Sequence, residues 1–213
     1  MRMRTIMVLN PKGGCGKSTL VTNLASYYAT QGLSVVIADF DNQQSSLAWL
    51  AVRPETANPI LGVNAEKEAI RIPKSTDVVI LDVPAGIRGK DLTAAMRRVQ
   101  TIIIPVLPSP IDIRAAARFI HDLLVTGKVS RKEVKLAVVA NRVKENTTIF
   151  HTLEKFLKHL SIPFVTSLRD TQNYIKAADL GIGIFEMAPS QVARDLEQWV
   201  PLLKWLASKR SRP

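Results

Sequence analysis

The sequence has few of the features that stabilise secreted proteins or anchor proteins in membranes. Its 213 residues include one cysteine, Cys15, so no disulfide can form within the chain. No apolar run approaches the roughly 18 residues of a membrane-spanning helix, and no apolar stretch of signal-peptide length follows the basic start. These absences argue against a disulfide scaffold and a transmembrane protein. We expect a soluble, cytoplasmic protein in a reducing compartment.

Acidic residues are also scarce. The chain has 18 Asp and Glu against 29 Lys and Arg, which gives a formal net charge of +11 at pH 7. A basic excess of this size attracts polyanions, nucleic acid first and anionic membranes second, although an ordinary basic surface would give the same balance. The length suits one domain, and we predict a single domain that spans residues 1–213.

Apolar runs rich in Val and Ile alternate with segments of helical periodicity. Strands are predicted at residues 5–10, 34–38, 77–81, 101–106, 134–140 and 163–166, and helices at 18–31, 47–52, 92–99, 113–125, 149–160 and 188–207. Residues 54–73 are predicted as a loop with a short helix, and the prolines at 105, 108 and 110 are expected to end strand pairing. Uninterrupted apolar strands separated by helices predict a doubly wound α/β fold, with a mostly parallel sheet covered on both faces.

A glycine-rich loop with the sequence PKGGCGKST occupies residues 11–19, between the first predicted strand and helix. This context is typical of a phosphate-binding loop, in which backbone N–H groups converge on phosphate oxygens at a helix N-terminus. Lys17 is predicted to reach the β- and γ-phosphates, Ser18 to ligate Mg²⁺ and Thr19 to contact the α-phosphate. A glycine-rich turn without a ligand is the alternative. The other predicted nucleotide contacts of the loop are Lys12, Gly13, Gly14, Cys15 and Gly16.

Three acidic residues follow predicted strands, where ligands of parallel sheets bind. Asp82 ends an apolar run and is predicted to hold the metal through water. Asp39 and Asp41 lie two residues apart, so only one of them can easily point at the site, and either could be an Asx-type loop residue instead.

The loop departs from the common G-x-x-x-x-G-K-[ST] pattern, because Pro11 stands at the first glycine position and Lys12 adds a second lysine. Its K-G-G-x-G-K-S pattern resembles the deviant Walker A motif of the ParA/MinD ATPase family. Residues 39–45 resemble that family's D-x-D-P-Q-x-S segment, with Asn42 in place of proline. Residues 78–82 resemble its Walker B strand. Residues 105–112 resemble the P-V-x-P-S-x-x-D stretch of small ParA proteins. The resemblance is closest to ParF-type and McdA-type proteins. It implies a P-loop fold with ATP and Mg²⁺ as cofactors.

The resemblance also implies roles for individual residues. Asp41 would orient or activate the attacking water, and Asp39 would support the metal region. Lys12 would reach across an ATP-sandwich dimer to the partner's phosphates, much like an arginine finger supplied in trans, unless it is simply a solvated lysine. Asn141, followed by Arg142, occupies the place of an adenine-contacting Asn, although a plain turn Asn fits nearly as well.

Proteins of this kind bind nonspecific DNA as ATP dimers and position a cargo over the nucleoid. The resemblance therefore implies a plasmid, a chromosome region or a carboxysome-like organelle as cargo, and a ParB-, ParG- or McdB-like adaptor that stimulates hydrolysis. Independent support comes from cations that crowd the C-terminus with no acid after Glu197. We define this C-terminal basic cluster, the predicted DNA contact, as Lys204, Lys209, Arg210 and Arg212. A flexible basic tail without such a role is the alternative. Further basic groups are Arg97 with Arg98, Arg114 with Arg118, and Arg131 with Lys132.

The principal rival is a MinD-like ATPase that binds a membrane. The last predicted helix has an apolar stripe along one face, and cations follow the helix in the sequence, as in helices that lie on membranes. Trp205 lies outside this stripe and is expected to be exposed. A helix packed on a sheet has the same stripe, and the DNA-binding hypothesis is favoured. The stripe consists of Leu196, Trp199, Val200, Leu203 and Leu206. A metal-cluster carrier would need a Cys pair, and no ligand spacing connects His121, His151 and His159.

Overall fold

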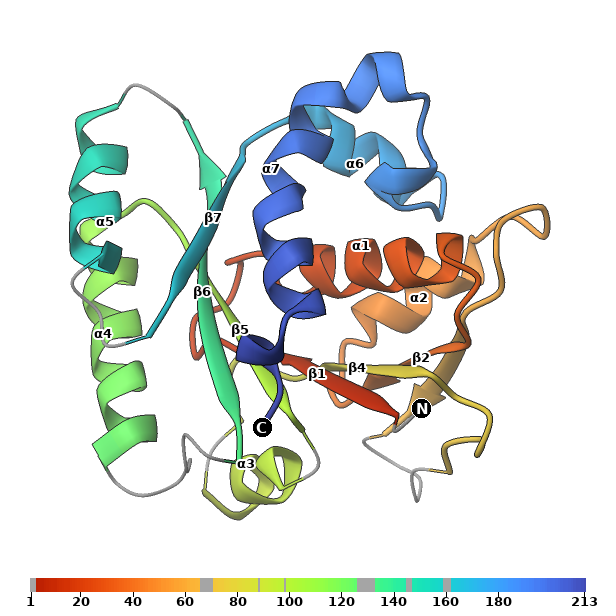
Figure 1. Ribbon diagram of the computed structural model, residues 1–213, viewed down its shortest axis with the longest axis horizontal. Coiled ribbons are helices and arrows are strands. Elements are labelled where there is room, and N and C mark those ends of the chain that lie inside the picture. Colours follow the sequence, from red (N-terminus) through yellow and green to blue (C-terminus); the bar gives the residue numbers. More distant parts are fainter. Residues whose placement is uncertain are drawn as a thin grey trace. The chain divides into compact units, whose positions relative to one another are not determined.

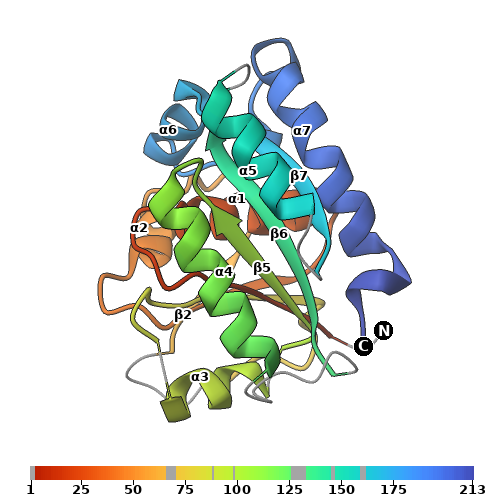
Figure 2. The same cartoon turned by 90° about the vertical axis from the view of Figure 1, so that its left-hand side faces the viewer.

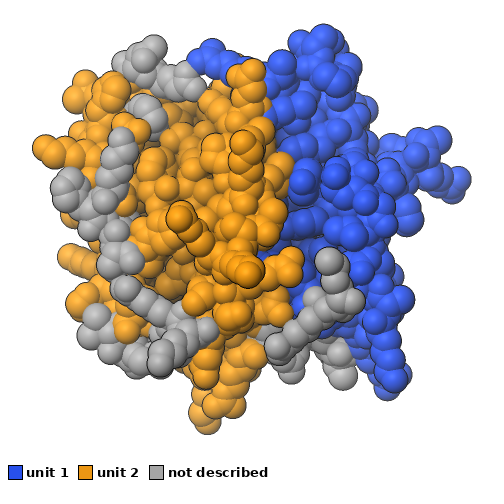
Figure 3. Space-filling model, viewed as in Figure 1, with its two compact units in different colours: residues 1–8, 17–84, 171–196 blue, residues 9–16, 85–170, 197–213 orange. Residues whose placement is uncertain are grey.

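The computed structural model describes residues 3–65, 71–87, 89–97, 99–125, 133–144, 147–158 and 162–213. Two compact units make up the chain and are coloured separately in Figure 3. The first unit comprises residues 1–8, 17–84 and 171–196, and the second comprises residues 9–16, 85–170 and 197–213. The single domain expected from chain length stays a prediction.

In the first unit, the described residues form four parallel strands in the order β3-β2-β4-β1. The strands are β1 (Arg4–Val8), β2 (Val35–Asp39), β3 (Leu61–Asn64) and β4 (Val78–Asp82). Helix α1 (Lys17–Thr30) packs against β4 and β2, and α2 (Ser45–Ala51) packs against β2 and β3. The unit also contains α6 (Gln172–Asp179), the short 3₁₀ helix η1 (Ile184–Glu186) and the first part of α7 (Pro189–Ala207) (Figure 1).

In the second unit, the described residues form three parallel strands in the order β5-β6-β7. The strands are β5 (Thr101–Val106), β6 (Lys135–Val143) and β7 (Phe164–Arg169). Figure 2 shows α4 (Pro110–Val125) and α5 (Thr148–Lys158) on one side of these strands, with the part of α7 that belongs to this unit, residues 197–207, on the other. Helix α3 (Gly89–Met96) and the 3₁₀ helix η2 (Lys209–Ser211) complete the unit.

The strands form the cores of both units. All five residues of β1, β2 and β4 are buried, and so are all six of β5, because strands covered on both faces have no solvent side. The predicted α/β fold class with a parallel sheet is confirmed, since every pair of strands described within the units is parallel.

A buried ion pair holds the end of α2 to η1 within the first unit. Arg53 donates to both carboxylate oxygens of Glu186, at 3.0 and 2.5 Å, and the two side chains are 6% and 10% exposed. The same guanidinium donates to the carbonyl oxygens of Asn58 and Gly181 and lies 5.2 Å from the centroid of the Trp49 ring. A pair with this many partners fixes the segment that follows α2.

Several sequence-based predictions need correction. Strand β3 lies within residues predicted as a loop, and α6 was not predicted at all. Pro105 does not end pairing, since it lies opposite Val139 inside the β5–β6 ladder. Trp205, expected to be exposed, is 9% exposed and therefore buried. Most other boundaries shift by a few residues, with the C-termini of β2 and β4 extended to Asp39 and Asp82.

Candidate functional site

The glycine-rich loop belongs to the second unit as far as Gly16, and Asn10 organises it. The Lys12 backbone N–H donates to Asn10 Oδ1 at 2.9 Å, while Asn10 Nδ2 donates to the Pro105 carbonyl oxygen at 2.5 Å. The Cys15 thiol donates to the Lys12 carbonyl oxygen at 3.3 Å. These contacts fix the backbone of Lys12 between the end of β5 and the glycines that follow.

Asn141, at the carboxyl end of β6, supports the loop directly. Its side chain is buried, and Nδ2 donates to the Cys15 carbonyl oxygen at 2.8 Å. Gly16 has a φ of +88°, and a Cβ on it would lie 2.2 Å from Asn141 Nδ2. The close approach of Asn141 therefore requires a glycine at position 16. The Asn141 side-chain amide, predicted to contact adenine, thus uses its nitrogen to bind the phosphate loop.

Arg142, predicted beside Asn141 as a nucleotide contact, lies at an exposed position with a positive φ of 53°. Its Nε lies 3.3 Å from Asp170 Oδ1, and Asp170 follows β7, the neighbouring strand. Sequence reasoning missed Asp170, because the strand was predicted to end at residue 166 and the observed β7 continues through Arg169.

In the first unit, Asp39 and Asp82 end adjacent parallel strands and lie opposite each other in the β2–β4 register. Their side chains are 0% and 1% exposed. Lys17 and Ser18 begin α1, and the Asp82 carboxylate accepts hydrogen bonds from the Ser18 and Ser46 hydroxyls. Four residues predicted separately from the sequence, Asp39, Asp82, Lys17 and Ser18, thus belong to one cluster.

Burial dominates the electrostatics of this cluster. Loss of solvation raises the pKa of Asp82 above its ordinary value, against the opposing effects of the serine hydroxyls and of the Lys17 charge. Burial likewise raises the pKa of Asp39, with a further contribution from Asp82, while backbone N–H groups oppose the shift. A buried carboxylate of this kind is stabilised by an added cation.

The two acids of the segment after β2 have different surroundings. Asp39 accepts hydrogen bonds from the backbone N–H groups of Asp41 at 2.9 Å, Ser46 at 3.2 Å and Leu47 at 3.4 Å, so it organises the start of α2. Asp41 is half-buried, and its Oδ1 accepts from the Gln43 backbone N–H at 3.0 Å. Of the two, Asp41 has the side chain that solvent can reach.

The donor set fits Mg²⁺ better than a transition metal. A serine hydroxyl and a carboxylate are hard oxygen ligands, and Mg²⁺ in phosphate sites commonly uses one or two such groups with water and phosphate oxygens. In the part of the chain that the structure describes, no group of three or more His, Cys, Asp or Glu side chains could hold a metal ion. Ser18 and Asp82 are thus suited to a metal that arrives with a phosphate ligand.

Residues 6–184 match the family model described as the CobQ/CobB/MinD/ParA nucleotide binding domain. The chain belongs to this family. It is 26% identical over 190 residues to maintenance of carboxysome distribution protein A from Halothiobacillus neapolitanus, with 86% of this chain and 87% of that protein covered. It is 25% identical to the septum site-determining protein MinD of Synechocystis, with 96% and 94% covered.

Among solved structures, the chain is similar to a plasmid partition protein from Borrelia burgdorferi bound to AMPPNP. The TM-score is 0.72 and the identity 15%, with 95% of this chain and 99% of that one covered. At this identity the likeness shows the fold alone. The fold predicted from the strand pattern and the family predicted from the loop motif are both confirmed.

The C-terminal basic cluster of this ParA/MinD-family chain is exposed at all four positions. The segment that carries it is anchored, since Ser211 is fully buried and its carbonyl oxygen accepts a hydrogen bond from the Thr101 hydroxyl at 2.5 Å. The Ser211 hydroxyl donates to the Leu206 carbonyl oxygen at 2.8 Å. Three members of the cluster, Lys209, Arg210 and Arg212, are therefore presented by an anchored turn beside the first residue of β5, and Lys204 lies on α7.

The other basic groups are only partly described. Arg97, Arg114 and Arg118 are exposed. Their predicted neighbours Arg98, Arg131 and Lys132 lie outside the described residues, as does His159, while His121 and His151 are exposed on helices.

The apolar stripe of α7 packs inward. Trp199 and Leu206 are 0% and 2% exposed, Leu196 and Leu203 are half-buried, and Val200 at 41% is the one stripe member that is exposed. Trp199 and Leu206 therefore belong to the core, whereas Leu196, Leu203 and Val200 keep some contact with solvent. No helix of the described residues has the length and apolar character required to cross a membrane.

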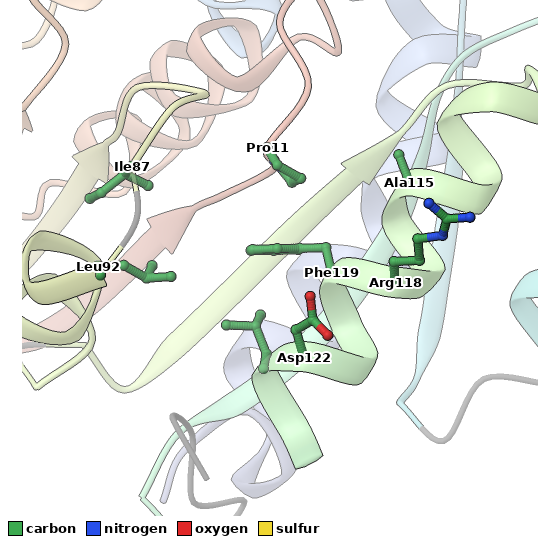
Figure 4. Close-up of a pocket in the computed structure, with 9 residues that line it drawn as sticks. Pro11, Ile87, Leu92, Ala115, Arg118, Phe119 and Asp122 are labelled. Carbon is green, nitrogen blue, oxygen red and sulfur yellow. The ribbon is translucent and has the colours of Figure 1, made fainter. Parts of the chain in front are cut away.

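A separate pocket of about 360 Å³ opens within the second unit beside Pro11, between α3 and α4 (Figure 4). Leu92 and Phe119 lie on its walls, and Arg118 and Asp122 lie one turn apart on α4. None of the predicted site residues lines it. This pocket is therefore not part of the candidate site, which rests on the hydrogen bonds and buried charges described above.

Proposed function

We propose that this chain is a ParA-type ATPase that binds ATP·Mg²⁺, dimerises around it and binds nonspecific DNA in the ATP state. Hydrolysis, stimulated by an adaptor protein, returns weakly binding monomers, and the cycle positions a large cargo. The observation that carries the proposal is the Asp82 cluster: a buried carboxylate bonded to Ser18 and close to Lys17, the two residues that complete the phosphate-loop motif.

Each site residue has a role in this proposal. Backbone N–H groups of residues 12–16, with Lys17, bind the β- and γ-phosphates, and Thr19 contacts the α-phosphate. Ser18 and Asp82 hold Mg²⁺, Asp82 through water. When bound, Mg²⁺ neutralises charge on the transferring phosphate.

Asp41 is the residue proposed to orient the attacking water. Its accessibility supports this role, because a water must reach the carboxylate. Asp39 supports the metal region by fixing the backbone N–H of Asp41 and the start of α2. Asn141 supports the loop, and Arg142 with Asp170 lies at the strand ends where a nucleobase would be bound.

Lys12 is proposed to act in trans. Lys17 is 9% exposed and its charge acts on Asp82, so it serves the phosphates of its own protomer. Lys12 precedes the glycines on a backbone fixed by Asn10, and it is half-buried. We assign it to the partner's phosphates across the ATP-sandwich dimer, where it would stabilise transition-state charge.

The C-terminal basic cluster is proposed to bind DNA phosphates. Fixed, exposed cations supply affinity that does not depend on sequence and falls steeply with salt. Dimerisation doubles the cluster, so DNA binding would follow ATP binding, and the protein would associate with the nucleoid in the cytoplasm. The cargo is a plasmid, a chromosome region or a carboxysome-like organelle, and the adaptor is ParB-, ParG- or McdB-like.

The test measures binding to random-sequence duplex DNA without nucleotide, with ADP and with ATP, at low and moderate salt, beside anionic liposomes. We expect tight, salt-sensitive DNA binding with ATP only. Liposome binding in place of DNA binding would identify a MinD-like membrane ATPase instead. Nucleotide binding with neither surface bound would refute the DNA-binding switch.

A further inference from the structure

Ser46 joins the two buried carboxylates of the first unit. It is the second residue of α2 and is fully buried. Its hydroxyl donates a hydrogen bond to Asp82 Oδ2, and its backbone N–H donates to Asp39 Oδ2 at 3.2 Å. One residue thus contacts the acidic residue at the end of β2 and the acidic residue at the end of β4.

The segment that carries Asp41 is fixed by the same two acids. The Phe40 backbone N–H donates to the Asp82 carbonyl oxygen at 2.8 Å, and the Asp41 backbone N–H donates to Asp39 Oδ1 at 2.9 Å. Of these contacts, the Ser46 hydroxyl is the one that reaches the Asp82 side chain. The start of α2 and the orientation of the Asp82 carboxylate are therefore mechanically linked.

A hydrogen bond to one oxygen restricts rotation of the whole carboxylate. The two oxygens together offer about four acceptor positions, so a bond from Ser46 leaves others for Ser18 and for metal-bound water. Partners of this kind fix a ligand's orientation, and their loss typically lowers metal affinity by about 10- to 100-fold.

We propose that Ser46 is a positioning residue that orients Asp82 for Mg²⁺ and links metal binding to the segment that carries Asp41. This inference rests on the proposed function, because it requires a nucleotide-bound Mg²⁺ at Ser18 and Asp82. The expected consequence is specific: Ser46→Ala impairs the use of Mg²⁺ and leaves the metal-independent part of nucleotide affinity unchanged.

The experiment follows a fluorescent, non-hydrolysable ATP analogue bound to the full chain while Mg²⁺ is titrated, with EDTA as the metal-free reference. For Ser46→Ala we expect the Mg²⁺ concentration at half-maximal response to rise about 10-fold or more, with analogue affinity in EDTA within about 2-fold of the unmutated chain. Ser26→Ala is the matched control, because Ser26 is fully buried and its hydroxyl donates to the Asn23 carbonyl oxygen of its own helix, at 3.0 Å.

Two further comparisons keep the outcome decisive. Ser46→Cys is nearly isosteric and a weak donor, so it should shift the Mg²⁺ response in the same direction even where the alanine variant folds poorly. An unchanged Mg²⁺ response in both folded variants, or an equal shift in Ser26→Ala, would overturn the positioning role alone. Failure of the unmutated chain to bind the analogue at any Mg²⁺ concentration would overturn the proposed function, and this inference with it.

Discussion

Replacing Gly16 by alanine should damage the phosphate loop in two ways that can be calculated separately. Gly16 has a φ of +88°, and an L-residue in the left-handed region costs about 1–2 kcal/mol. The new Cβ would also lie 2.2 Å from Asn141 Nδ2, so the Asn141 side chain or the loop must move. Loss of the bond from this buried amide to the Cys15 carbonyl oxygen costs a further 1–3 kcal/mol or so.

The two effects together predict that the loop loses at least about 2 kcal/mol of stability in its binding conformation. Because 1.4 kcal/mol corresponds to a factor of ten, ATP affinity should fall by roughly 30-fold or more. Isothermal titration calorimetry with ATP·Mg²⁺ measures this affinity, and circular dichroism during heating establishes that the variant is folded.

Gly32→Ala is the matched control, since Gly32 has a φ of +75° and no atom lies within 4 Å of the position that a Cβ would occupy there. It should lower the free energy of unfolding by about 1–2 kcal/mol and leave ATP affinity unchanged. The reasoning is refuted if folded Gly16→Ala binds ATP within about 3-fold of the unmutated chain.

Three further predictions concern stability and charge. Arg53→Ala removes the cation that pairs with the largely buried Glu186 carboxylate, which still accepts from the Gly183 backbone N–H. The free energy of unfolding in chemical denaturation should fall by about 3–5 kcal/mol, against about 0–1 kcal/mol for Arg142→Ala at an exposed pair. Burial raises the pKa of Asp82, so the folded chain binds a proton at this group more tightly than the unfolded chain does. At a pH below the ordinary pKa of 3.8 the protonated group therefore favours folding, and this contribution is lost as the pH rises through the folded-state pKa. Asp82→Asn should therefore stabilise the nucleotide-free chain at neutral pH, by a margin that shrinks on acidification; a constant margin would contradict this. Alanine at all four positions of the C-terminal basic cluster should weaken the salt dependence of DNA binding. The slope of log K against log salt concentration should become shallower by up to about 3.6 per protomer, at roughly 0.9 for each phosphate that is no longer neutralised. Lys176→Ala should have little effect on this slope.

The strands could be predicted because their signal is local. Six predicted strands correspond to β1, β2, β4, β5, β6 and β7. All but β7 are buried for most of their length and have an apolar run with no solvent face, whereas β7 (FVTSLR) is half-buried at four of its six residues. Strand β3 was missed because it lies at the edge of the described sheet, next to β2, and its side chains are half-buried or exposed, which removes the apolar pattern. Helix α6 was missed because it is short and buries little besides Ala177; its N-cap, Thr171, was the available signal.

The site was predictable where its chemistry lies in a motif. The phosphate loop, Asp39 and Asp82 follow from spacing and strand ends, and the structure brings Lys17, Ser18, Asp39 and Asp82 together in the first unit. Their roles toward a nucleotide and a metal stay predictions. Asn10 and Ser46 were not predicted, because each acts through hydrogen bonds to residues distant in the sequence. Contacts of that kind leave no periodic or motif signal in a single sequence.

The assignment of Lys12 tests the central claim most directly. Sedimentation velocity with a non-hydrolysable ATP analogue, for the unmutated chain and Lys12→Ala, measures whether nucleotide produces a dimer and whether this lysine is needed for it. We predict a nucleotide-dependent dimer for the unmutated chain and a monomer for Lys12→Ala that still binds the analogue. Equal dimerisation of both proteins, with equal rates of ATP hydrolysis, would contradict the account of an ATP-sandwich dimer completed by Lys12.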